Sequence, residues 1–284
     1  MSQKSKKSLQ RRIFIQTLST LSPTELTAFK IFCNQSLANT EQTKSLFSFI
    51  CKAAPDFEKL TEDKILSRFF PDKPKAKVLL NYALHDLFEL LQKWLIQQEL
   101  ANDKSLQDQL YIRACKKRFL HQQFFRKTRQ TLEAFENDLP VPDNWYKLFE
   151  SNFHWFYHSH TPKNLKSIPS LSGMETNLEL FYQGSKIRLF CLQTNRIKKL
   201  NLSTDNDDKE LSSTIEFAQQ HANDIPFFAL YLQLIEYLQQ PDITVLKVFF
   251  QNFKRDRTKL DRLDQTLLIF IAAYSLIDTT MKGN

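Results

Sequence analysis

Glycine is nearly absent from the sequence, which holds 3 glycines among 284 residues. Loops that bind nucleotide phosphates need glycine, because there the backbone N–H groups approach the anion closely. Neither G-x-G-x-x-G nor G-x-x-x-x-G-K-S/T occurs, which excludes nucleotide-binding enzymes of these two designs. Two-residue hairpin turns also favour glycine. The sequence has no Asn-Gly or Asp-Gly pair, which argues against an all-β fold.

Closely paired cysteines are missing as well. The four cysteines are scattered without a C-x-x-C pair, at Cys33, Cys51, Cys115 and Cys191. The basic N-terminal stretch is interrupted by polar residues and has no small-residue cleavage site, unlike a secretory signal peptide. We therefore expect reduced thiols in the cytoplasm. No cysteine has a catalytic signature around it, and no G-x-S-x-G motif occurs. We therefore predict that the protein is not an enzyme, and we assign no catalytic residue and no cofactor.

Long apolar runs are the third absence. The most apolar stretch, residues 267–277 (LLIFIAAYSLI), is shorter than the roughly 18 residues that a membrane span needs. We expect a buried helix there and no membrane partner. A terminal helix that is apolar on nearly every side needs a cover. Further chain, self-association with a second copy, and the N-terminal module folding back are the three alternatives.

Apolar residues at three- and four-residue spacing, by contrast, are abundant. This is the spacing of one face of an α-helix, and it continues along most of the sequence. The stretch LSPTELTAFKIF also carries a helix start. Ser22 and Glu25 are spaced for a capping box, and Pro23 suits the first helical position. Leu26 and Phe29 then begin the apolar face.

Successive helix pairs recur at intervals of very roughly 35 residues, a period typical of helical-hairpin repeats. The sequence therefore predicts an all-α fold of antiparallel helical hairpins, either a tetratricopeptide-like α-solenoid or an irregular helical bundle. We divide it into an N-terminal helical module, residues 1–100, and a helical-hairpin repeat region, residues 101–284. Proline and serine near 161–173 predict a linker inside the second region.

Four stretches carry a resemblance to known proteins: LSPTELTAFKIFCN, KLTEDKILSRFFPDKP, LFELLQKWLIQQEL and NLELFYQGSKIRLFCLQTNR. They resemble uncharacterised tetratricopeptide-like helical proteins of Bacteroidetes-type bacteria. The resemblance covers about half the chain and consists mainly of packing patterns. It implies tetratricopeptide-like helices and a cytoplasmic protein, but no activity and no site residues. Gly184 falls inside the last of these stretches, where it interrupts the predicted helix.

A cluster of histidines raises the question of a metal site. On a helix, Glu150, His154 and His158 stack at successive i, i+4 positions, opposite an aromatic face. Two histidines so spaced can share a zinc ion, with the carboxylate as a third ligand. The alternative is an ordinary polar helix face. We favour that alternative, because no H-E-x-x-H motif and no second cluster supplies a fourth ligand. No metal site is assigned.

A basic segment is the more specific candidate. The chain has a formal charge of +8, and no acidic residue lies between Asp108 and Glu133. Within that gap the segment is predicted to form two helices, with one helix continuous near Lys117 as the alternative. Three phenylalanines are interleaved with the cations, as in grooves that bind single-stranded nucleic acid. The basic residues are Arg113, Lys116, Lys117, Arg118, Arg126, Lys127 and Arg129.

The leading hypothesis from the sequence is a non-enzymatic protein–protein interaction module or scaffold, because stacked hairpins offer a concave surface to a protein partner. The alternative is a helical protein that binds nucleic acid through the basic 113–129 segment. A continuous basic stripe across a groove would favour nucleic acid. Mixed charges beside an apolar groove would favour a protein partner. In both cases the seven basic residues are the predicted contacts.

Overall fold

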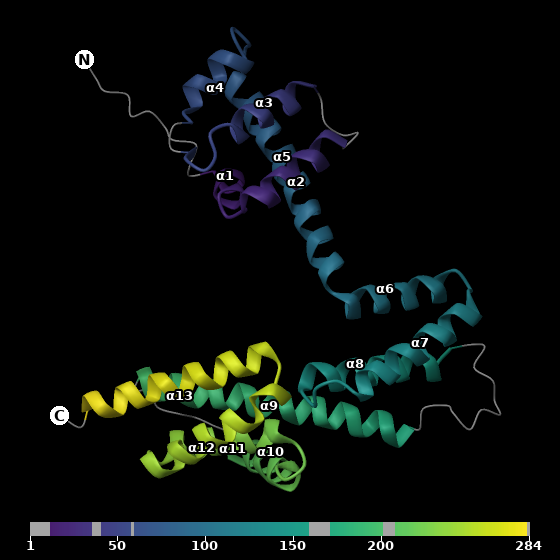
Figure 1. Ribbon diagram of the computed structural model, residues 1–284, viewed down its shortest axis with the longest axis vertical. Coiled ribbons are helices and arrows are strands. Elements are labelled where there is room, and N and C mark those ends of the chain that lie inside the picture. Colours follow the sequence, from purple (N-terminus) through teal and green to yellow (C-terminus); the bar gives the residue numbers. More distant parts are fainter. Residues whose placement is uncertain (1–11, 36–40, 58–59, 159–170, 201–207, 283–284) are drawn as a thin grey trace. The chain divides into compact units, whose positions relative to one another are not determined.

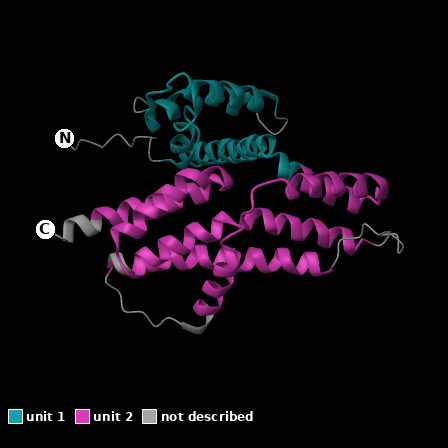
Figure 2. Cartoon of the chain, turned by 60° about the horizontal axis from the view of Figure 1, so that its bottom comes forward, with its two compact units in different colours: residues 1–107 teal, residues 108–284 magenta. Residues whose placement is uncertain are grey.

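A computed structural model describes residues 12–35, 41–57, 60–158, 171–200 and 208–282 of the chain. Over these ranges the chain forms thirteen α-helices and no strand (Figure 1). The all-α fold predicted from apolar spacing is confirmed. The chain divides into two compact units, which we call unit 1, residues 1–107, and unit 2, residues 108–284 (Figure 2).

Unit 1 is a small helical domain built around one long helix. Its helices are α1 (Ile13–Leu18), α2 (Pro23–Gln35), α3 (Glu41–Cys51), α4 (Glu62–Phe69) and α5 (Ala76–Asn102). The first four helices pack against α5. Aromatic rings fill the centre. The Phe29 ring lies 5.1 Å from the Phe47 ring and 5.6 Å from the Trp94 ring, so α2, α3 and α5 share one core.

The start of α2 shows why this helix begins where it does. The backbone N–H of Ser22 donates to Glu25 Oε2 at 2.8 Å, and the backbone N–H of Glu25 donates to Ser22 Oγ at 3.3 Å. These reciprocal bonds form the capping box expected from the sequence. They satisfy two backbone donors that the helix itself leaves without acceptors.

Unit 2 holds the remaining helices, beginning within α6. They are α6 (Lys104–Lys117), α7 (His121–Glu136), α8 (Pro142–Phe156), α9 (Leu171–Leu200), α10 (Asp208–His221), α11 (Pro226–Gln239), α12 (Ile243–Asp256) and α13 (Arg262–Lys282). Helix α9 packs against α8, α10, α11 and α13, and α11 packs against α9, α10, α12 and α13. Both α9 and α11 therefore contact the helices next to them in sequence, and they also contact each other. The apolar core of unit 2 lies between these helices.

The structure describes only the end of the linker predicted near 161–173. Residues 159–170 lie outside the described residues, and α9 begins at Leu171. Residues 171–173 are therefore helical, which corrects the predicted end of the linker. Two side chains near the start of α9 bond back to the preceding turn of the helix. Thr176 Oγ1 donates to the Ser172 carbonyl and Asn177 Nδ2 donates to the Gly173 carbonyl, both at 2.9 Å.

Gly184 lies in the middle of α9, where the sequence reads as an interrupted helix. The helix continues through it, and α8 packs closely against α9 at this point. A Cβ atom at residue 184 would lie 2.8 Å from Pro142 Cγ and 2.9 Å from Trp145 Cζ3. Phe227 Cε1 of α11 would lie 3.4 Å from the same Cβ atom. Glycine is needed here for close helix packing, at the cost of its poor helix propensity.

A buried ion pair joins three helices of unit 2. Arg188 of α9 donates to Asp264 of α13 through Nε at 2.9 Å and through a terminal guanidinium nitrogen at 2.8 Å. The Tyr231 hydroxyl of α11 donates to the same carboxylate at 2.7 Å. Asp264 is fully buried. Burial raises the pKa of Tyr231 far above its ordinary value, so the phenol stays protonated and acts as a donor.

Candidate functional site

The basic segment is split by a sharp turn. Helix α6 ends at Lys117 and α7 begins at His121, so the alternative of one continuous helix is wrong. The Leu120 N–H donates to the Cys115 carbonyl at 3.0 Å, and the Phe119 N–H donates to the Lys116 carbonyl at 3.3 Å. This pair of bonds is the Schellman motif that ends many helices. It places Phe119 in the left-handed region, with φ of 57°.

Phe119 is unfavourable at this position in two ways. Left-handed backbone costs a non-glycine residue roughly 1–2 kcal/mol, and glycine is the usual residue here. The side chain is also 74% exposed, so the ring contributes little apolar burial to the fold. The turn uses the left-handed backbone at residue 119 but gains nothing from a phenylalanine there, and residues in such backbone regions cluster at functional sites. Phe119 is therefore a candidate contact residue.

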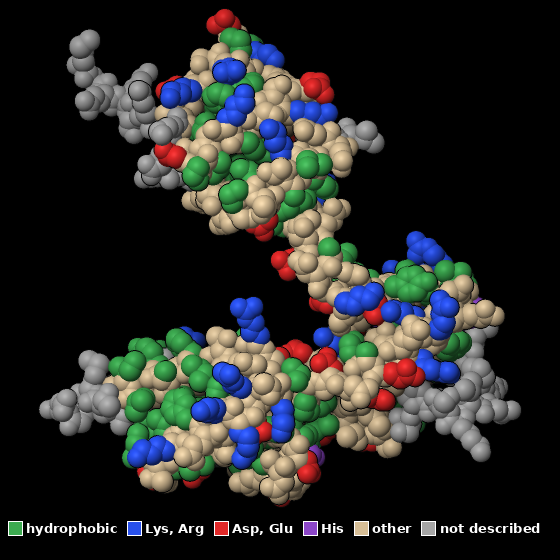
Figure 3. Space-filling view, in the orientation of Figure 1, with side chains coloured by type: hydrophobic (Ala, Val, Ile, Leu, Met, Phe, Trp, Pro, Cys, Tyr) green, Lys and Arg blue, Asp and Glu red, His purple; other side chains and the backbone are tan. Residues whose placement is uncertain are grey.

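Basic residues flank Phe119 in the sequence. Lys116, Lys117 and Arg118 are exposed at the end of α6, and Arg126 is exposed one turn into α7. Cations at a helix C-terminus are stabilised by the helix dipole, which helps to hold three of them together. We call Phe119 with these four basic residues the α6–α7 tip. Basic and hydrophobic side chains share the surface over this part of unit 2 (Figure 3).

The other three predicted contacts each have a partner within unit 2. Arg113 donates to Glu150 of α8 at 2.6 Å, and Lys127 lies 2.6 Å from Asp108 of α6. The Arg129 guanidinium carbon lies 5.8 Å from the centre of the Trp155 ring. Two of the seven charges are thus neutralised by carboxylates. Arg113 and Lys127 are therefore less available to a partner than the four basic residues of the α6–α7 tip.

The aromatic residues interleaved with the cations also divide. Phe124 is fully buried, and Phe125 packs with its ring 5.8 Å from the Trp155 ring. Only Phe119 of the three faces solvent. Sequence spacing could not separate them, because Phe119 follows Ile112 and Cys115 at the intervals of one apolar helix face. The helix ends before that face reaches residue 119.

The histidine row does not persist as a metal-binding arrangement. His154 Nε2 lies 3.7 Å from Glu150 Oε1, but the same Glu150 oxygen accepts the bond from Arg113. Helix α8 ends at Phe156, and His158 packs with its ring 4.2 Å from the Phe124 ring. Burial lowers the pKa of His154, and the nearby Lys116 lowers it further. Among the described residues no group of three or more His, Cys, Asp or Glu side chains could hold a metal ion.

Burial favours the neutral form of three of the four cysteine thiols. Burial raises the pKa of Cys33 to about 12 and that of Cys51 to about 11. Burial also raises the pKa of Cys191 to about 12. The thiolate is the reactive species of cysteine, so these three side chains are poor nucleophiles at neutral pH.

The last helix presents a second surface. Leu268 and Ile271 of α13 are fully buried, whereas four apolar side chains on its other side are exposed: Ile269, Phe270, Tyr274 and Ile277. They line an open hollow of about 670 Å³ together with residues of α12 and with Arg257. Hydrophobic side chains gather over α12 and α13 (Figure 3). We call these four side chains the α13 outer face.

Comparison with known proteins gives no relative from which a function could be transferred. Searches with family profiles, of curated proteins and of solved structures found no match to this chain. No helix in the described ranges is long and apolar enough to cross a membrane. The candidate sites therefore rest on their own geometry.

Proposed function

We propose that the protein is a non-enzymatic interaction module of the cytoplasm that binds an acidic partner protein through the α6–α7 tip. The observation that carries the proposal is Phe119, a strained and largely exposed ring flanked by cations. A ring in such a place suits a small apolar pocket on a partner, and aromatic and Arg residues are enriched at the energetically important points of protein interfaces. The flanking cations favour an acidic rim.

A protein partner fits the tip better than nucleic acid does. Single-stranded nucleic acid is bound along a basic groove, with several exposed rings on which successive bases stack. The tip offers one exposed ring, since Phe124 is buried and Phe125 packs against Trp155. Three of its four cations, Lys116, Lys117 and Arg118, are consecutive residues at one helix end. Nucleic acid remains the alternative that the experiment below must separate.

The packing of unit 2 supports the tetratricopeptide-like part of the proposal. The pairs α8–α9 and α10–α11 pack as neighbours, and α9, α11 and α13 contact one another in turn. Such contacts, from each helix to the next and to the one after, are typical of stacked hairpins. We propose that these pairs act as a short repeat stack that holds the tip in place.

Substitution at the tip is expected to abolish partner capture. Tagged full-length protein is incubated with native lysate, with and without nuclease, as the wild type and as Phe119→Gly. A second variant replaces Lys116, Lys117 and Arg118 with glutamine. Both variants are expected to lose the nuclease-resistant proteins that the wild type retains, because one removes the ring and the other the charges. Loss of a central interface residue costs about 2 kcal/mol or more, which is about thirtyfold in affinity.

Tyr82→Ser is the matched control. Tyr82 is an aromatic residue of α5 that is 64% exposed and lies outside the α6–α7 tip. It is expected to retain the same proteins as the wild type. Equal retention by Phe119→Gly and by Tyr82→Ser would contradict the proposal. Capture that disappears with nuclease in the wild type would assign the tip to nucleic acid instead.

We also propose that the α13 outer face pairs with a second copy of the chain. Its apolar residues recur at helical spacing, and Ala273 between them allows close approach. An antiparallel pairing would place the two Arg257 side chains at opposite ends, so these two charges would not meet. Because the interface is modest in size, we expect the wild-type protein to sediment as a dimer at protein concentrations of roughly tens of micromolar. The Phe270→Glu variant is expected to sediment as a monomer. A wild-type monomer at every concentration would exclude this pairing.

A further inference from the structure

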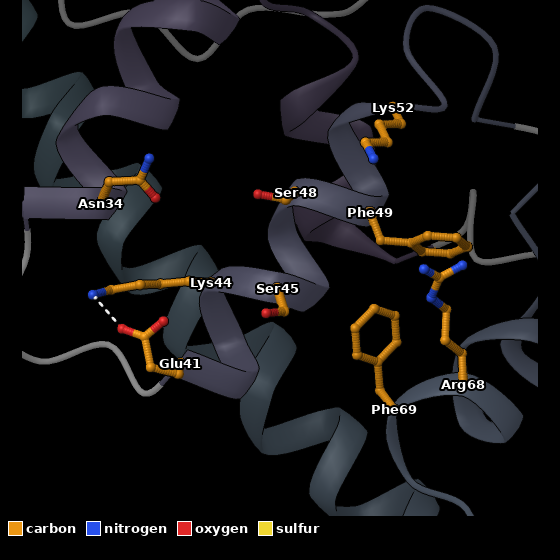
Figure 4. Close-up of a pocket in the computed structure, with 9 residues that line it drawn as sticks. All are labelled: Asn34, Glu41, Lys44, Ser45, Ser48, Phe49, Lys52, Arg68 and Phe69. Carbon is orange, nitrogen blue, oxygen red and sulfur yellow. Dashed lines mark hydrogen bonds and ion pairs between the residues drawn. The ribbon is translucent and has the colours of Figure 1, made fainter.

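An open hollow in unit 1 gathers polar side chains for which the fold has no evident use. It lies between the end of α2, the outer face of α3 and the end of α4 (Figure 4). Its volume is about 520 Å³. Small-molecule sites commonly have volumes of roughly 300–1,000 Å³, so the hollow is large enough for a ligand of that class.

Arg68 is held in place on one side of the hollow by aromatic rings. Its guanidinium carbon lies 4.8 Å from the centre of the Phe49 ring and 5.8 Å from that of Phe69. The two rings contact each other edge to face, 5.5 Å apart. Gln42 Nε2 donates to the Phe69 carbonyl at 2.7 Å, which ties α3 to the end of α4. The rings orient the guanidinium through its face, which leaves its N–H donors at the edge available for a ligand.

Helix α3 supplies the opposite side. Lys44, Ser45, Ser48 and Lys52 lie within roughly 100° of one another around the helix, so they form one polar face. Figure 4 shows this face and Arg68 around the same hollow. Lys44 pairs with Glu41 at 3.1 Å. One of the three cations around the hollow is therefore neutralised.

Four other polar side chains of the hollow have no hydrogen-bond or ion-pair partner in the part of the chain that the structure describes: Ser45, Ser48, Lys52 and Arg68. Two cations and two hydroxyl groups thus line the hollow, and the Glu41 carboxylate that also lines it is paired with Lys44. An arginine fork matches the oxygens of phosphate and carboxylate, and lysine adds a point charge. Serine hydroxyls donate to the same kind of oxygen.

We infer that this hollow is a binding site for a small phosphate-bearing anion. Arg68 and Lys52 bind the phosphate oxygens, and the hydroxyls of Ser45 and Ser48 complete the donor set. Phe49 and Phe69 give the site an apolar wall beside the phosphate. The site is independent of the α6–α7 tip, since it lies wholly in unit 1.

Calorimetric titration of the full-length protein tests the site, with phenyl phosphate and inorganic phosphate as separate probes. The wild type is expected to bind with one saturable site. Arg68→Lys keeps the charge but loses the fork, and Lys52→Gln loses a charge. Each is expected to weaken binding by at least about tenfold, since charge-assisted hydrogen bonds are the stronger class. Lys93→Gln is the control, because Lys93 is an exposed lysine of α5 that lies outside the hollow.

The two probes distinguish the source of the phosphate. Tighter binding of phenyl phosphate assigns an ester whose organic part contacts the Phe49 and Phe69 wall, and equal binding assigns recognition of phosphate alone. Absence of saturable binding for both probes overturns the inference. Equal weakening by Lys93→Gln and Lys52→Gln also overturns it, because that would be a general effect of charge. If Arg68→Lys changes the circular dichroism spectrum, Lys52→Gln decides the result.

Discussion

Asp264→Ala is expected to lower the free energy of unfolding of unit 2 by about 3 kcal/mol, because it leaves the charge of Arg188 without its main partner in the protein interior. The carboxylate accepts two bonds from Arg188 and one from Tyr231. Asp143 and Asp261 lie 3.6 Å and 3.9 Å from Arg188, so part of the charge stays compensated. Hydrogen exchange of amides in α9 and α11 measures the loss within unit 2.

Asp256→Ala is the matched control for this prediction. Asp256 binds Arg255 and Lys259, whose side chains are 70% and 57% exposed. Water replaces the lost carboxylate there, so the expected cost is no more than about 1 kcal/mol. Adding Arg188→Met to Asp264→Ala is expected to restore part of the stability, because it removes the uncompensated charge. A double variant less stable than Asp264→Ala alone would contradict this explanation.

Gly184→Ala is expected to lower the free energy of unfolding of unit 2 by about 1–2 kcal/mol. Two effects oppose each other. Alanine gains about 1 kcal/mol in helix propensity over glycine. Overpacking of a filled core costs about 1–3 kcal/mol, and more where the neighbours cannot move. The added methyl would meet the rings of Pro142 and Trp145 below 3.0 Å, with Phe227 behind them, so the clash outweighs the propensity.

Ser185→Ala provides the comparison, since it makes the same kind of change in the next residue of α9, where the side chain is only half-buried. Its helix propensity rises without the clash at residue 184, and we expect stability to be unchanged or slightly higher. Urea unfolding followed by circular dichroism compares the two variants. A stabilised Gly184→Ala protein would show that α8 can move away from α9.

The helices of this protein could be predicted from the sequence because their signals are local. Apolar spacing marks the buried faces, and the capping box of Ser22 and Glu25 forms as the spacing predicts. Pro226 at the first position of α11 is a second such signal. Each of these effects acts between residues a few positions apart, so the fold class follows from the sequence alone.

The contacts that decide the candidate sites are not local. Arg113 and Glu150 are 37 residues apart, and Arg188 and Asp264 are 76 apart, so spacing along the chain could not pair them. The basic segment therefore read as seven equivalent cations. Gly184 read as a weakness of its helix because Pro142 and Trp145, which require it, lie far earlier in the sequence.

Phe119 shows the same limit at the scale of one residue. Its place after Ile112 and Cys115 fits an apolar helix face. The turn at residues 118–120 instead gives it a left-handed backbone and exposes the ring. A glycine at this position would have marked the turn in the sequence. The polar hollow of unit 1 was missed for a related reason, because α3 and Arg68 meet only in the folded domain.

The central claim is that Phe119 serves binding rather than folding, and the free energy of unfolding of Phe119→Gly tests it most directly. Glycine adopts the left-handed conformation without strain, so we predict that unit 2 becomes more stable by about 1 kcal/mol. The same variant loses its partner in the capture experiment. A loss of stability of similar size would show that the ring supports the fold, and the α6–α7 tip would then no longer be distinguished as a binding site.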